Sequence, residues 1–178
     1  MEATVNPVTR EDIPEEAKWD LNGLYLKESL WQEDIKKLEK DLSGYESFKG
    51  TLASSAKNIK SCLEFDVSIS RAIEKLYTYA HLRNDEDKTN SQNQSNFEKI
   101  VRLHTLAAQA SSYISSELMA ISEDRMHQFL KDKQLDYYKL HLERILRYRK
   151  YTLSEKEEKI LASSAEIARA ARNAFEML

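Results

Sequence analysis

Helix-breaking residues are confined to the first fifty positions of this 178-residue chain. Both prolines, Pro7 and Pro14, and all three glycines, Gly23, Gly44 and Gly50, lie there. Proline lacks a backbone donor and glycine loses the most backbone entropy on folding, so both residues interrupt helices. The remaining sequence contains neither of them, which predicts long helices. We therefore expect an all-α fold, an antiparallel bundle of about five to six helices.

Apolar residues recur at three- and four-residue intervals, the spacing that places them on one helix face. This periodicity predicts helices over residues 29–43, 55–87, 97–118, 122–131 and 135–149, and a last helix from 154. Ser154 and Glu157 fit a capping box, in which each side chain satisfies a free backbone N–H at a helix start. In the helix over 97–118 the inward stripe is predicted to contain Phe97, Val101, His104, Ala108, Ser111, Ile114 and Leu118.

The two ends of the chain differ from this helical body. Residues 1–22 have no periodicity and hold both prolines, so we expect an extended segment, with Trp19 and Leu21 as anchors onto the helices. Residues 23–178 are predicted to form the helical domain, with a possible sub-boundary near 121–122. The last helix ends on apolar residues without a glycine cap or a basic last turn. From this ending we expect a continuation that the chain lacks.

Composition narrows the class of protein. With 41% hydrophobic and 32% charged residues, the chain is too apolar for a disordered protein and too polar for a membrane protein. A net charge of -3 provides no basic field, so we expect neither nucleic acid nor a membrane as partner. The single cysteine, Cys62, excludes an intrachain disulfide and fits a reducing compartment. No signal peptide precedes the helices, and we predict a soluble, cytoplasmic protein.

The histidines do not form a metal-binding pattern. A zinc peptidase helix carries His-Glu-x-x-His, which places two ligands and a general base on one face. Here His81, His104, His127 and His141 are too far apart in sequence for any two to share a helix turn. His104 falls on an apolar stripe, so we interpret it as a buried core histidine. We predict no catalytic residue, no metal ligand and no cofactor in this chain.

For three other sequence patterns, a structural role is favoured over a binding or catalytic role. The acidic run 85–87 lacks the glycine that a calcium-binding loop requires at its sixth place, which favours a solvated helix end. Arginines and tyrosines alternate over 144–151 and would suit RNA, but neighbouring glutamates favour a salt-bridged helix end. Cys62 lies on an apolar helix face, which favours a buried structural thiol.

Several stretches resemble the amino-terminal region of oligoendopeptidase F, a zinc metallopeptidase of the thimet oligopeptidase superfamily. They are REDIPEE (10–16) with KWDL (18–21), YTYAHLRNDED (77–87) with TN (89–90), and TLSE (152–155) with EE (157–158). The third stretch coincides with the capping box. One departure is Lys150-Tyr151, where the family often has Pro-His. The resemblance covers most of this chain but only the beginning of such an enzyme.

The resemblance implies a helical lobe that helps to wall a deep channel, which admits short, unstructured peptides. The catalytic zinc would belong to the longer enzyme, and the partners of this chain would be the missing catalytic domain and short peptides. His81, Arg83 and Asp85 are the candidates for residues that face the channel. The alternative for these three is a structural cluster of ion pairs and caps.

Two further hypotheses concern the chain as a whole. It would be a stand-alone helical interaction module with no enzymatic activity, which uses its exposed apolar last helix to self-associate or to bind a partner helix. The other is an RNA-binding domain that uses residues 144–151. The sequence downstream of Leu178 distinguishes the oligoendopeptidase F fragment from the stand-alone module, because only the enzyme continues to a His-Glu-x-x-His helix.

Overall fold

The structure, a computed structural model, describes residues 13–151. Within this range every regular element is helical, with six α-helices, four 3-10 turns and no strand, which confirms the predicted all-α fold. The chain divides into two compact units, residues 1–137 and 138–178. None of the helices in the described range is long and apolar enough to cross a membrane.

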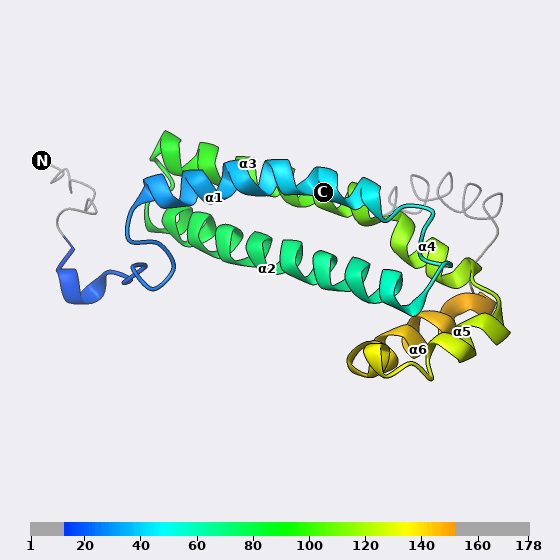
Figure 1. Cartoon of the computed structure of the whole chain (residues 1–178). Coiled ribbons are helices and arrows are strands. Elements are labelled where there is room, and N and C mark those ends of the chain that lie inside the picture. The colour runs from blue at the N-terminus through cyan, green and yellow to red at the C-terminus, as the bar shows by residue number, and fades with distance from the viewer. Residues whose placement is uncertain (1–12, 152–178) are drawn as a thin grey trace, which may run out of the picture. The chain divides into compact units, whose positions relative to one another are not determined.

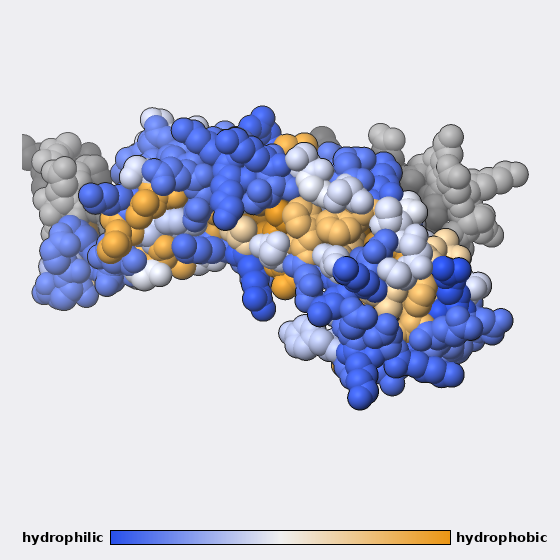
Figure 2. Space-filling view, in the orientation of Figure 1, coloured by the Kyte–Doolittle hydropathy of each residue, from blue (hydrophilic) through white to orange (hydrophobic). Residues whose placement is uncertain are grey.

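Three helices form the body of the first unit. Helix α1 spans Glu28–Asp41, α2 spans Ala56–Glu86 and α3 spans Ser91–Ser111. Helix α2 packs against both α1 and α3, and the 3-10 turn η3 (Leu42–Ser47) contacts all three (Figure 1). Figure 2 shows hydrophilic side chains over α1 and hydrophobic ones in the seam between α1 and α2. This separation of faces follows the predicted 3.6-residue periodicity.

Shorter elements complete the two units. In the first unit α4 spans Tyr113–Ala120 and α5 spans Glu123–Phe129, and the 3-10 turn η2 (Glu15–Ala17) precedes α1. The 3-10 turn η4 (Lys133–Tyr138) runs across the division between the units. In the second unit α6 spans Lys139–Tyr148 and is followed by the 3-10 turn η5 (Arg149–Tyr151). The predicted capping box at 154–157 and the last helix lie outside the described residues.

The core of the first unit is tied together by buried aromatic side chains with satisfied polar atoms. Trp31 of α1 is fully buried, and its indole N–H donates to the backbone carbonyl of Leu76 in α2 at 2.9 Å. Tyr45 of η3 donates its hydroxyl to Asp66 of α2 at 2.7 Å, and its carbonyl accepts from the hydroxyl of Tyr113 at 2.8 Å. A buried indole or phenol without such a partner would cost free energy, so these bonds select one arrangement of the helices.

The anchor of the amino-terminal segment differs in part from the prediction, because Leu21 is half-buried but Trp19 is not. Trp19 is 53% exposed, whereas Tyr25 is buried. The ring of Tyr25 meets Tyr79 of α2 edge to face at a centroid distance of 5.2 Å, and its hydroxyl donates to Asp34 at 2.8 Å. Tyr25 has both an apolar contact and a polar partner available, which explains why it takes the buried position. The sequence-predicted boundaries at 22–23 and near 121–122 stay predictions.

The predicted inward stripe of the third helix is wrong by about one position over its first part, whereas Ile114 and Leu118 are buried as predicted. His104 is exposed and Val101 is 40% exposed. The buried face of α3 consists instead of Asn93, Asn96, Ile100, Leu103 and Ala107. Two asparagines begin this stripe, and a search for apolar periodicity alone passes over them. A break at Ser112 also divides the predicted helix into α3 and α4.

Candidate functional site at the turn between helices α2 and α3

The end of α2, the turn that follows and the start of α3 contain the residues that the sequence singled out. Asp87 closes the turn, because its carboxylate accepts from the backbone N–H of Thr89 at 2.9 Å. Asn90 caps α3, and its side-chain oxygen accepts from the backbone N–H groups of Gln92 and Asn93 at 3.0 and 3.1 Å. Short polar side chains are preferred at such positions because they satisfy free backbone donors.

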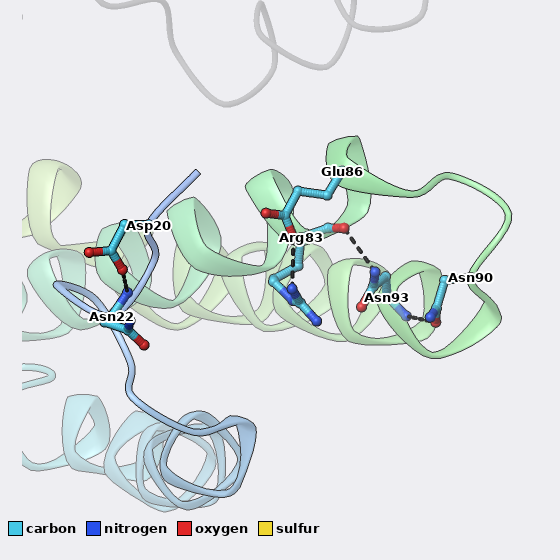
Figure 3. Close-up of polar contacts among 6 residues, drawn as sticks. All are labelled: Asp20, Asn22, Arg83, Glu86, Asn90 and Asn93. Atoms are coloured by element: carbon cyan, nitrogen blue, oxygen red, sulfur yellow. Dashed lines mark hydrogen bonds and ion pairs between the residues drawn. The ribbon is translucent and has the colours of Figure 1, made fainter. Parts of the chain in front are cut away.

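Arg83 connects the two helices. Its guanidinium donates to the carboxylate of Glu86 at 2.7 Å, and its backbone carbonyl accepts from the side-chain amide of Asn93 at 2.8 Å (Figure 3). The side chain of Glu86 is only 3% exposed, whereas that of Arg83 is 38% exposed. A carboxylate this buried requires a charged partner. The Arg83 side chain therefore neutralises the buried carboxylate of Glu86 while part of it remains exposed to solvent.

His81 and Asp85 form a second group on α2. His81 Nδ1 lies 3.2 Å from a carboxylate oxygen of Asp85, one helix turn further on. The imidazole ring also stacks on Tyr77 and meets the edge of Phe97 of α3, with centroid distances of 5.6 and 5.4 Å. Positions two apart on a helix point in different directions. The structure thus brings His81 and Asp85 together but places Arg83 elsewhere on the helix.

An open pocket of about 470 Å³ lies beside Arg83. Tyr79, Arg83 and Glu86 of α2 line the pocket together with residues of the segment that precedes α1, including Asp20 and Asn22. Figure 3 shows Asp20 and Asn22 on that segment and Arg83 and Glu86 on α2. Asp20 accepts from the backbone N–H of Asn22 at 2.9 Å, which shapes this segment. His81 and Asp85 do not line the pocket. Sequence reasoning missed Asp20 and Asn22, although an Asp two residues before an Asn is a turn signal.

Comparison with known proteins shows which family the chain resembles. A family model described as Oligopeptidase F matches residues 117–178. Oligopeptidase PepF of Bacillus subtilis (strain 168) is 32% identical over 170 residues, which are 95% of this chain and 25% of that protein. Group B oligopeptidase PepB of Streptococcus agalactiae (serotype III, strain NEM316) is 31% identical over 170 residues, 95% of this chain and 28% of that protein. Over nearly all of its length, the chain is similar to the amino-terminal region of oligoendopeptidase F.

Solved structures agree with this assignment. A crystal structure of a Chlamydophila abortus protein named as a peptidase superposes with a TM-score of 0.82 at 32% identity, over 93% of this chain and 28% of that one. Oligoendopeptidase-F from Enterococcus faecium gives a TM-score of 0.64 at 30% identity, over 84% of this chain and 30% of that one. The chain matches the amino-terminal region of oligoendopeptidase F and spans about a quarter of the length of the curated relatives.

Within this oligoendopeptidase F region, Asn96 organises a buried polar network that the sequence analysis did not identify. Its side-chain oxygen accepts from the amides of Gln32 in α1 and Gln92 in α3, each at 3.0 Å, and its amide donates to Glu28 at 2.8 Å. Asn96 is 7% exposed. A satisfied buried amide fixes the relative position of two helices, because any slip would leave it unpaired.

Among the described residues, the side chains do not fit the zinc that the resemblance to this family implies. Within residues 13–151 no group of three or more histidine, cysteine, aspartate or glutamate side chains is placed to hold a metal ion. His104 and His141 are exposed, and His127 lies 3.7 Å from Glu123. Burial raises the pKa of the Cys62 thiol to about 11, so this thiol is not a metal-binding thiolate at neutral pH.

Proposed function

We propose that this chain is the amino-terminal helical region of a longer zinc peptidase of the oligoendopeptidase F type, which hydrolyses short peptides. In this proposal the chain forms part of the wall of the substrate channel, and a catalytic domain further along the polypeptide supplies the zinc chemistry. The observation that carries the proposal is the match to named peptidases over 94–95% of this chain but only 25–28% of theirs.

The packing of the first unit is consistent with a rigid wall of the proposed substrate channel. Helices α1, α2 and α3 are held by the buried hydrogen bond of Trp31 and by the Asn96 network, and the α2–α3 turn is held by Asn90 and Asn93. Such bonds keep a helical surface in one shape while peptides enter and leave. His81, Arg83 and Asp85 remain the candidates for contacts with peptides, and Arg83 is the one that lines a pocket.

Peptidase assays on two purified proteins test whether catalysis requires a domain beyond this chain. The 178-residue chain, supplied with zinc and an internally quenched short peptide, is expected to show no chelator-sensitive cleavage. A longer protein that continues past Leu178 to a His-Glu-x-x-His motif is expected to cleave the same peptide. Chelator-sensitive activity of the short chain would contradict the proposal, and so would a stop codon directly after Leu178 in the source gene.

A histidine substitution in the longer protein tests whether the wall meets the substrate. His81→Ala is expected to raise the KM for peptides about threefold with little effect on kcat, because it removes ground-state binding. His127→Ala is the control, since His127 is also a helical histidine one turn from a carboxylate and its side chain is exposed. Unchanged kinetics for His81→Ala, or an equal change for both variants, would remove His81 from the proposed wall.

The alternative of a stand-alone interaction module was predicted to use the last helix, which lies outside the described residues, and it has one supporting observation on a different helix. In the second unit, Leu140 and Tyr148 of α6 are 59% and 67% exposed. Large apolar side chains on a helix surface are typical of a docking face. Sedimentation of the 178-residue chain over a range of concentrations tests this: self-association that Leu140→Ser abolishes would support the module, whereas a monomer at every concentration would count against it.

A further inference from the structure

One exposed surface of the first unit is free of formal charge. Over residues 103–116 the sequence contains no aspartate, glutamate, lysine or arginine, although 32% of the whole chain is charged. This stretch covers the second half of α3 and the start of α4. We define the neutral face by the exposed members of this stretch and by Val101, and the exposed Arg102 borders it. Its members are Val101, His104, Thr105, Leu106, Ala108, Gln109, Ser112, Ser115 and Ser116.

The outer surfaces of the neighbouring helices are different. On α1 the exposed residues include Glu33, Lys36, Lys37, Glu39 and Lys40. On α2 they include Lys57, Glu64, Arg71, Glu74 and Lys75. Surfaces that face water normally carry such charges, whereas the centres of protein interfaces are depleted in them. Val101 and Leu106 of the neutral face are also 40% and 43% exposed, which is costly for large apolar side chains in water.

Two hydroxyl groups of this surface already have partners. Thr105 donates to the carbonyl of Val101 at 3.1 Å, and Ser112 donates to the carbonyl of Gln109 at 2.8 Å. Because these side chains bond to their own helix, another helix can cover them without leaving a donor unsatisfied. Ala108 adds a small side chain that permits close approach. These two hydroxyl groups therefore add little to the cost of desolvating the neutral face.

We propose that the neutral face is the surface on which the downstream part of the longer enzyme packs. This inference rests on the proposed function, because it requires that longer enzyme. Its support is that the curated relatives continue for about three times the length that this chain matches, so polypeptide of the same molecule is available to cover an apolar, uncharged surface. Packing within one chain also needs no charged rim to select a partner.

Thiol labelling tests this packing directly. Cys62 is the only cysteine of the chain and is fully buried, so a cysteine introduced on the surface reports its own accessibility. Ala108→Cys places a thiol on the neutral face. Ser70→Cys is the matched control, because Ser70 is exposed in the charged surface of α2. Each variant is made in the 178-residue chain and in the longer protein, and labelling by a maleimide is followed by peptide mass spectrometry.

The thiol introduced by Ala108→Cys is expected to label at least about tenfold more slowly in the longer protein than in the short chain. The thiol introduced by Ser70→Cys is expected to label equally fast in both proteins, because the charged surface of α2 stays in water. Slow labelling of Cys62 reports that each protein is folded.

Two results would overturn the inference. One is an equal labelling rate for the Ala108→Cys and Ser70→Cys variants of the longer protein. The other is slow labelling of the Ala108→Cys variant of the short chain that becomes faster on dilution, because a second copy would then cover the face. Peptidase activity of the longer protein separates failure of the packing face from failure of the proposed function.

Discussion

Gly44 shows how a single residue sets the spacing of two elements. It lies in η3, where a Cβ atom would come within 2.7 Å of Cζ of Phe65 on α2. The ring of Phe65 is itself held by Tyr45 and Phe48, with centroid distances of 4.9 and 5.5 Å. The aromatic ring therefore has little room to move. Glycine allows η3 to pass this close to α2, a requirement that no sequence pattern announces.

Substitution of Gly44 by alanine should therefore destabilise the fold. We expect Gly44→Ala to lower the free energy of unfolding by roughly 1–3 kcal/mol, the range for an overpacked contact. Gly23→Ala is the control, because no atom lies within 4 Å of its Cβ position and its φ is not positive. Urea unfolding of both variants measures the difference. Similar midpoints for the two variants would show that Phe65 moves aside.

Cys62 predicts a loss of stability at alkaline pH. Burial raises the pKa of its thiol from 9.0 to about 11. Well below pH 9.0 the thiol is neutral in both states and its contribution is fully present. As the pH rises further, the unfolded state ionises first, so the free energy of unfolding falls until the folded pKa is passed. Cys62→Ala should lose less stability between about pH 9 and about pH 10, before tyrosines ionise in unfolded chains. Parallel curves for the two proteins would contradict this assignment.

Helices α2 and α3 show which features of a helix can be predicted from the sequence and which cannot. The start of α2 at Ser55 agrees with the prediction, and its hydroxyl accepts from the backbone N–H of Asn58 at 3.1 Å. The rotation of α3 about its axis was predicted wrongly. Its inward face begins with Asn93 and Asn96, whose partners lie on other segments. Polar residues are assigned to the surface by composition alone, and only their partners show that they are buried.

The contribution of the Asn90 cap to the stability of α3 can be tested by substitution. Asn90→Ala removes two hydrogen bonds to backbone N–H groups and is expected to lower the free energy of unfolding by about 1 kcal/mol. Asn90→Asp should retain most of the stability, because a carboxylate also accepts these bonds at a helix start. Chemical denaturation followed by circular dichroism provides both values. Equal losses for the two variants would indicate that the turn, not the cap, is the stabilising feature.

At the scale of the molecule, the division into units makes a prediction about truncation. Met126 and Leu135 are fully buried and belong to the first unit, beyond the boundary that the sequence suggested near 121–122. We expect a chain that ends at Tyr137 to keep cooperative thermal unfolding. A chain that ends at Ile121 should lose it, because these core side chains are removed. Cooperative unfolding of the shorter truncation would instead support the sequence-based boundary.

The helical class and most helix starts and ends of this oligoendopeptidase F region could be predicted from the sequence, because glycine, proline, caps and apolar periodicity act over a few residues. The candidate site was predicted only in part. His81 and Asp85 meet because they are one helix turn apart, which sequence spacing contains. The pocket beside Arg83 depends on Asp20, which lies far earlier in the chain, and the Asn96 network joins helices α1 and α3. Such contacts exist only after the helices have packed, since their partners are distant in sequence and are chosen by the geometry of the core.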